Sequence, residues 1–217
     1  MTDTPDRVVE ATIALLRRSG VAGAGINEVL QESGAPKGSL YHFFPGGKRQ
    51  IVVEALALYG ERVARYIGDA LQRGRDPAGK VRALFAAVAA RLQDADFQRS
   101  CAAGAAALDL DADLEEVRAM IVRDFSRWID VIAENIAIGG DTAARRSFAG
   151  LVLTAIEGGY VRGRAEHSTR PLLEAGEWLA TLAVQAGGPS TQAMNIQPAR
   201  PSRAGAGARA RRRGATR

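Results

Sequence analysis

Six residues between positions 37 and 48 have the chemistry needed to contact a polyanion. They comprise two lysines, a glycine, and three side chains that donate hydrogen bonds through a hydroxyl group or an imidazole ring. These residues are Lys37, Gly38, Ser39, Tyr41, His42 and Lys48. Lysine, serine and tyrosine side chains donate to phosphates or base edges, and a glycine lets the backbone approach a groove closely. The six residues therefore predict a contact surface for double-stranded DNA.

The elements that must present these residues are two short helices. Apolar spacing predicts a first helix over 26–33, which Gly25 can cap and Gly34 can end in a left-handed conformation. A second helix is expected to have Pro36 at its first position, where the missing N–H costs nothing, and to end near residue 43. Two short helices joined by a glycine-containing turn are typical of a helix-turn-helix, whose second helix is presented to the major groove.

Apolar residues in the second helix indicate which of its faces is buried. Leu40 and Phe44 lie four residues apart and are expected to pack against Val29 and Leu30 of the first helix. The candidate contact residues of the second helix then face outwards. Lys48 opens the next helix, where its cation and the free backbone amides together favour a phosphate.

The rest of the chain also has helical periodicity, with apolar residues recurring every three or four positions. Helices are expected over 5–19, 26–33, 36–43, 48–71, 77–93, 100–108, 113–136, 141–166 and 171–185. The last two segments are separated by a loop, and Asp113 with Glu116 is expected to start the seventh helix. We therefore expect an all-α protein of about nine helices, with a three-helix N-terminal domain over 1–47 and a larger helical domain over 48–187.

The net charge of +5 is unevenly distributed along the 217 residues. Residues 188–217 contain seven arginines and no acid, which leaves a net charge of −2 on the residues before them. This segment is rich in Gly, Ala, Pro and Arg, and we expect a disordered tail. It is interpreted either as a solvated extension or as an arm that binds phosphates without sequence preference.

Several classes of protein are disfavoured by composition. Cys101 is the single cysteine, so no internal disulfide forms, and we expect a buried small residue in a cytoplasmic protein. The sequence contains no run of 18 or more apolar residues, so it predicts no membrane-spanning helix. The acidic stretch 109–113 lacks the glycine and glutamate of a calcium loop, and His42 and His167 have no metal-ligand spacing. We expect no metal, no cofactor and no enzymatic activity.

The run Gly34-Ala-Pro-Lys-Gly-Ser-Leu-Tyr-His-Phe-Phe-Pro-Gly-Gly-Lys48 resembles the DNA-binding signature of the TetR family of bacterial transcriptional repressors, in its LmrA/YxaF-like branch. The resemblance extends over about residues 7–56. It implies a homodimer whose recognition helices enter successive major grooves of a palindromic operator, about 34 Å apart. It further implies that a small, mostly apolar effector releases the DNA.

Two positions depart from the pattern of that family. Ala24-Gly25 stands where the family usually has Thr or Ser, so a side-chain cap is lost. Phe43 stands where the family usually has a second histidine, and one phosphate donor is not carried over. The first 48 residues hold five basic and five acidic side chains, which predicts modest affinity for DNA of any sequence.

In the family fold, the fourth, fifth, seventh and eighth helices surround a ligand cavity. Several aromatic and aliphatic residues of this chain fall on those helices, and each is either a cavity residue or ordinary core. The candidates are Tyr66, Phe85, Val88, Phe125, Trp128, Ile129, Ile132, Ile156, Glu157 and Tyr160. Glu157 is interpreted either as a polar anchor for the ligand or as part of a salt bridge at the dimer edge.

The eighth and ninth helices are the candidates for a dimer interface, because small residues on them permit close approach of helices. The candidate residues are Phe148, Leu151, Val152, Ala155, Gly159, Leu172, Leu179 and Leu182. The alternative is that these residues only close the core of one subunit.

Two other function classes stay open. One is a DNA-binding helical protein that uses its basic tail without sequence preference, and the other is a helical enzyme. The helix-turn-helix pattern favours the ligand-responsive repressor over both.

Overall fold

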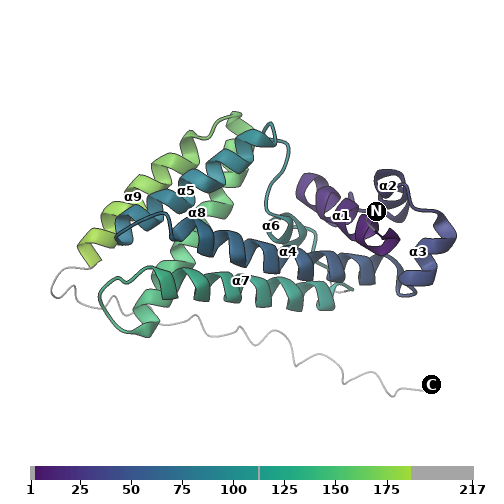
Figure 1. Ribbon diagram of the computed structural model, residues 1–217, viewed down its shortest axis with the longest axis horizontal. Coiled ribbons are helices and arrows are strands. Elements are labelled where there is room, and N and C mark those ends of the chain that lie inside the picture. Colours follow the sequence, from purple (N-terminus) through teal and green to yellow (C-terminus); the bar gives the residue numbers. More distant parts are fainter. Residues whose placement is uncertain (1–2, 112, 187–217) are drawn as a thin grey trace, which may run out of the picture.

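The computed structural model describes residues 3–111 and 113–186, and within these ranges every regular element is an α-helix (Figure 1). The helices are α1 (Thr4–Ser19), α2 (Ile26–Ser33), α3 (Lys37–Phe43), α4 (Gly47–Leu71), α5 (Pro77–Asp94), α6 (Ala102–Ala107), α7 (Glu115–Asn135), α8 (Thr142–Glu166) and α9 (Arg170–Ala186). This confirms the expected all-α fold. The predicted tail, 188–217, lies outside the described residues.

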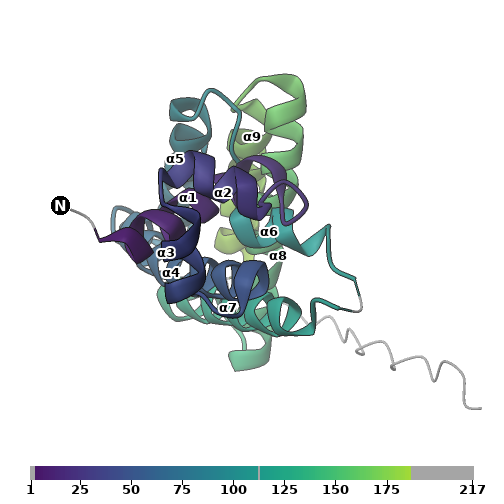
Figure 2. The same cartoon turned by 90° about the vertical axis from the view of Figure 1, so that its right-hand side faces the viewer.

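The first three helices form a small bundle at one end of the molecule (Figures 1 and 2). Its core contains Leu16 of α1, Val29 of α2, and Leu40 and Phe44 of the α3 segment, each at most 2 % exposed. Because Leu40 and Phe44 point inwards as predicted, the remaining side chains of α3 are left on the outside of the bundle.

The turn between α2 and α3 is shaped by its glycine and proline. Gly34 adopts φ 64° and ψ 19°, the left-handed conformation that glycine enters without steric cost. The expectation that Pro36 is the first helical residue is wrong by one position. Pro36 is the N-cap, with an extended ψ of 141°, and its carbonyl oxygen accepts the first helical bond from the Leu40 amide at 3.1 Å.

The long helix α4 joins the N-terminal bundle to the rest of the molecule (Figure 1). It packs along α7, while α5 packs along α9 in the part most distant from α3. An ion pair between Glu10 of α1 and Arg62 of α4 ties the bundle to this helix. The sequence periodicity predicted each of these helices to within a few residues of its bounds.

The start of α7 differs from the expectation. Asp113 does not cap the helix, because Leu114 occupies the N-cap position and provides no side-chain hydrogen bond. The amide of Asp113 instead donates to Asp111 Oδ1 at 3.0 Å, which forms a local turn before the helix.

In the described part of the chain, none of the helices combines the length and the apolar character needed to cross a bilayer.

Candidate nucleic-acid interface and internal cavities

The six predicted DNA-contact residues lie on α3 and on the first turn of α4. Lys37, Gly38, Tyr41 and His42 are exposed, whereas Ser39 and Lys48 are half-buried. Tyr41 is 46 % exposed, so both its ring and its hydroxyl group are accessible to another molecule. The exposed face of α3 is therefore formed by hydrogen-bond donors and aromatic rings.

Gly38 is not explained by packing within the subunit. A Cβ atom added there would meet nothing within 4 Å, so a side chain would fit. Glycine also lowers the stability of a helix relative to alanine. The open space in front of Gly38 is the place where another molecule could approach the backbone of α3 closely.

The cations of this surface are available to a partner. In the part of the chain that the structure describes, neither Lys37 nor Lys48 forms a salt bridge, whereas Arg18 pairs with Glu32 at 3.4 Å. Phe43 is also exposed, at 42 %, and its ring contacts the His42 ring edge-on with centroids 5.0 Å apart. This residue presents an apolar edge where the family usually has a donor.

A small cavity of about 30 Å³ lies between α4, α5, α7 and α8. Six of the ten predicted ligand residues line it, namely Tyr66, Val88, Trp128, Ile156, Glu157 and Tyr160. Its volume suits about one water molecule. The Tyr66 hydroxyl donates to the Ala87 carbonyl oxygen at 2.7 Å, and the Arg91 guanidinium lies 4.5 Å from the centre of the Tyr66 ring.

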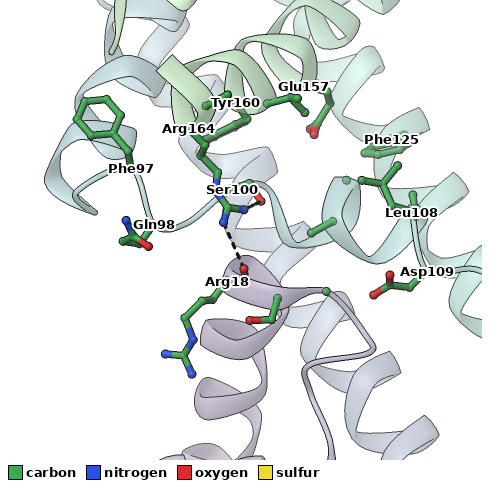
Figure 3. A pocket seen from close by; sticks show the side chains of 17 residues that line it. Arg18, Phe97, Gln98, Ser100, Leu108, Asp109, Phe125, Glu157, Tyr160 and Arg164 are labelled. Carbon is green, nitrogen blue, oxygen red and sulfur yellow. Dashed lines mark hydrogen bonds between the residues drawn. The ribbon is translucent and has the colours of Figure 1, made fainter. Parts of the chain in front are cut away.

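A second, open pocket has a volume of about 790 Å³ and lies where α8 and α6 approach the end of α1 (Figure 3). We call it the interdomain pocket. Three of the predicted ligand residues line it: Phe125, Glu157 and Tyr160. Glu157 and Tyr160 also line the small cavity, so these two side chains form the wall between the two spaces.

Three predicted ligand residues line neither space. Phe85 is 1 % exposed and packs against Gly176 of α9, where an added Cβ would collide with the phenylalanine ring. Ile132 is fully buried, and Ile129 faces Gly150 of α8. All three lie on the predicted helices, but the rotation of each helix in the fold directs them to other neighbours.

Other lining residues were missed by the sequence reasoning. Tyr59, Arg91 and Cys101 line the small cavity, and Phe97 and Arg164 line the interdomain pocket. A signal for Cys101 was its position before the Ala-rich helix α6, where its Sγ accepts from the Gly104 amide at 3.4 Å as an N-cap. The others have no local signal, because only the crossing of helices brings them together.

Burial controls the protonation of the acid between the two spaces. It raises the pKa of Glu157 to about 7, an effect that the neighbouring Cys101 thiol partly offsets. Burial also raises the pKa of the Cys101 thiol, and the adjacent Glu157 carboxylate adds to that increase. The thiol is therefore protonated at neutral pH, which disfavours reactivity as a nucleophile.

The predicted dimer residues divide into two groups. Leu151 of α8 and Leu182 of α9 are exposed by 48 % and 43 %, and Phe148 and Ala155 are half-buried. The other four, Val152, Gly159, Leu172 and Leu179, are buried within the subunit. Trp178 was not predicted, yet it is 74 % exposed one turn from Leu182.

An exposed donor-rich helix that packs on a short preceding helix through Leu40, followed by a helical domain with a small cavity and an open pocket, defines a helix-turn-helix transcriptional regulator. The matches to known families and proteins agree with this class. Residues 8–55 match the family of bacterial regulatory proteins called the tetR family, and residues 77–178 match the C-terminal domain of LmrA/YxaF-like transcriptional regulators. The chain belongs to the TetR family, in its LmrA/YxaF-like branch, and the members of this family are regulators rather than enzymes.

Among its relatives is the HTH-type transcriptional regulator LmrA of Bacillus subtilis, which is 30% identical over 172 residues, covering 79% of this chain and 92% of the relative. An HTH-type regulator of Mycobacterium tuberculosis is 32% identical over 173 residues, or 77% of this chain and 87% of the relative. The fold is also that of the regulator CifR, solved in complex with 26-base-pair operator DNA, with a TM-score of 0.70 and 23% identity over 81% of this chain and 95% of the other.

Proposed function

We propose that this protein is a repressor that binds a palindromic operator as a homodimer and leaves it when a small, mostly apolar effector binds. The observation that carries the proposal is the outer face of α3. Lys37 forms no salt bridge within residues 3–111 and 113–186, the backbone at Gly38 is open and Tyr41 is 46 % exposed, and all three suit a major groove.

The two-fold symmetry of the proposed operator follows from the proposed dimer. Exposed apolar side chains on α8 and α9, among them Leu151, Trp178 and Leu182, make a surface that a second copy could cover. Gly158 faces open space, so the helix of a partner subunit could approach α8 closely there. A dimer presents two α3 helices, and two helices read two half-sites.

Effector release is proposed to use the continuity of α4. This single helix of 25 residues has Lys48 in its first turn, at the DNA-binding end, and Tyr66 at the small cavity in its last third. A ligand that binds in the larger helical domain and displaces the helices packed against α4 would tilt this helix and change the spacing of the paired α3 helices. Such a regulator acts on DNA in the cytoplasm.

The proposal is tested by measuring binding to the DNA that flanks the protein's own gene. Fluorescence anisotropy would compare wild type with Lys37→Ala and with Arg65→Ala, which removes the same charge from an exposed position on α4. We expect Lys37→Ala to weaken binding and to reduce the salt dependence by about one phosphate per subunit, and Arg65→Ala to change neither. Tyr41→Ala should weaken binding by roughly 1–3 kcal/mol.

Two results contradict the proposal. One is the absence of binding by wild type to any flanking DNA, and the other is equal binding by the Lys37 and Arg65 variants. Either result would mean that α3 does not read DNA.

A further inference from the structure

The interdomain pocket touches the DNA-binding bundle directly. Arg18, Ser19 and Gly20, at the end of α1, line it, and so do Glu157, Tyr160 and Arg164 of α8. Figure 3 shows Arg18 on the opposite side of the pocket from Tyr160 and Glu157. A molecule in this pocket would contact both domains at once. The small cavity, in contrast, has no residue from α1 in its wall.

Hydrogen bonds at the edge of the pocket join the two domains. Asp109, after α6, accepts from the Ala22 amide at 2.9 Å, and its carboxylate fills the space next to Gly20. The Ser100 amide donates to the Arg17 carbonyl oxygen at 2.8 Å, and Arg17 Nε donates back to the Ser100 carbonyl oxygen at 3.0 Å. Any displacement of the segment 100–109 is therefore transmitted to the end of α1.

The chemistry of the pocket is set by Glu157. Its carboxylate lies against the Cα of Gly104, and a Cβ at that position would occupy the same space. The glycine thus makes room for the acid in a helix that is otherwise composed of alanine, Ala-Ala-Gly-Ala-Ala-Ala. This cradle holds the carboxylate at the boundary of the pocket.

The carboxylate has no cation to compensate its charge. Among residues 3–111 and 113–186, no arginine, lysine or histidine forms a salt bridge with Glu157. The two arginines of the pocket are already engaged, Arg18 by Glu32 and Arg164 by Ser100 Oγ and the Arg18 carbonyl oxygen. Figure 3 shows Arg164 directed towards the end of α1, whereas the Glu157 carboxylate lies against Gly104 of α6, so the part of the pocket next to Gly104 is faced by a carboxylate.

Aromatic rings complete the site. Phe97 and Phe125 lie on opposite sides of the pocket, and Tyr160 lies beside Glu157 (Figure 3). Aromatic faces attract organic cations, and a volume of about 790 Å³ is in the range of sites for drug-sized molecules.

We propose that the interdomain pocket is the effector site, that it takes a planar aromatic cation whose positive charge is held by Glu157, and that such a ligand displaces the segment 100–109 from the end of α1. This inference rests on the proposed function, and it names the location and the chemical class of the effector.

The test uses two dyes that share a xanthene ring and differ in charge, the cation rhodamine 6G and the anion fluorescein. Binding to the full-length chain is followed by fluorescence anisotropy without DNA, for wild type, Glu157→Gln and the exposed control Glu134→Gln. We expect rhodamine 6G to bind wild type and Glu134→Gln alike, and Glu157→Gln at least 10-fold more weakly. Fluorescein should bind all three weakly.

The pH profile of wild type provides a second readout that needs no variant. Because burial raises the pKa of Glu157 to about 7, its ionised fraction and the affinity for the cation should rise about tenfold from pH 6 to pH 8. Three weak acids near Glu157 stay protonated over this range, because burial raises the pKa values of Tyr59 on α4, Cys101 before α6 and Tyr160 on α8. The other charged side chains that line the two spaces are Arg18, Arg91, Arg164 and Asp109.

Equal affinity of wild type and Glu157→Gln for rhodamine 6G, tighter binding of fluorescein, or a flat pH profile would each overturn the inference. The DNA titration and the dye titration together separate the two proposals. If wild type binds DNA and Glu157 has no effect on the dye, only the effector assignment fails. If no DNA is bound, the proposed function fails, and the dye titration still reports on the pocket.

Discussion

The carboxylate of Asp124 on α7 lies directly against the Cα of Gly60 on α4, in the space that a side chain at position 60 would need. The carbonyl oxygen of the same glycine accepts a hydrogen bond of 2.9 Å from the Trp128 indole. Asp124 is 3 % exposed, and its Oδ2 atom has no hydrogen-bond partner among the described residues. The packing of α7 on the helix that reaches the DNA-binding domain thus depends on a glycine and a buried acid.

Gly60→Ala should destabilise the protein by about 1 to 3 kcal/mol, because the new methyl group collides with the Asp124 carboxylate and this outweighs the better helix propensity of alanine. Gly68→Ala on the same helix is the control, since its added Cβ would meet only Val131, at 4.0 Å. Urea unfolding should show a loss of stability for the first variant and a gain of up to about 1 kcal/mol for the second. Equal effects would mean that the contact at position 60 relaxes freely.

Asp124→Asn should stabilise the protein near pH 7.5 by about 1 to 3 kcal/mol and have little effect at pH 4. Burial raises the pKa of Asp124 from 3.8 to about 6, although Arg123 and Arg127 oppose the shift. The folded state therefore binds the proton more tightly than the unfolded state, and wild-type stability falls as pH rises from about 4 to about 6. Urea unfolding across this range should show that the difference between wild type and variant appears over the same interval.

Trp178→Glu should raise the dissociation constant of the proposed dimer at least about 100-fold. The reason is that the two-fold interface would bury an unpaired charge from each subunit. Val122→Glu, which replaces a 62 % exposed valine on α7, is the matched control and should leave the dimer intact. Sedimentation analysis at several concentrations provides the measurement. A monomeric wild type, or two variants that dissociate equally, would exclude α9 as the interface.

Phe43→His should restore a phosphate donor on α3. We expect the plot of log affinity against log salt concentration to steepen by about 0.9 per subunit at pH 6, where the imidazole is protonated, and by less at pH 8. Anisotropy titrations of both proteins on the same DNA check this, because His42 is present in both. An unchanged slope at pH 6 would show that position 43 does not face a phosphate.

Removal of residues 188–217 should weaken binding to DNA of any sequence, since seven arginines are lost. The ratio of affinities for flanking DNA and for a scrambled competitor should stay within about twofold, because base contacts belong to α3. Competition titrations of full-length and truncated chains measure this ratio. Loss of the ratio with the tail would favour the tail as the DNA-binding element.

Local patterns in the sequence predicted the helices and the side chains that α3 exposes. The apolar spacing, Gly34 and the prolines act over one or two turns of chain, so the bounds of α2 and the outward direction of Tyr41 could be inferred without knowledge of the rest of the fold. The errors at Pro36 and Asp113 are small because capping varies by a residue at little cost in free energy.

The cavities were decided by the tertiary structure. Phe85, Ile129 and Ile132 have the same apolar character as Val88 and Ile156, and only the rotation and crossing of the helices direct the first three into packed contacts and the last two to a cavity. The same crossing brings Glu157 to Gly104, Asp109 to the end of α1, and Asp124 to Gly60. Periodicity in the sequence determines which face of a helix is buried, but the partner of that face depends on contacts between residues distant in the chain, which no local pattern encodes.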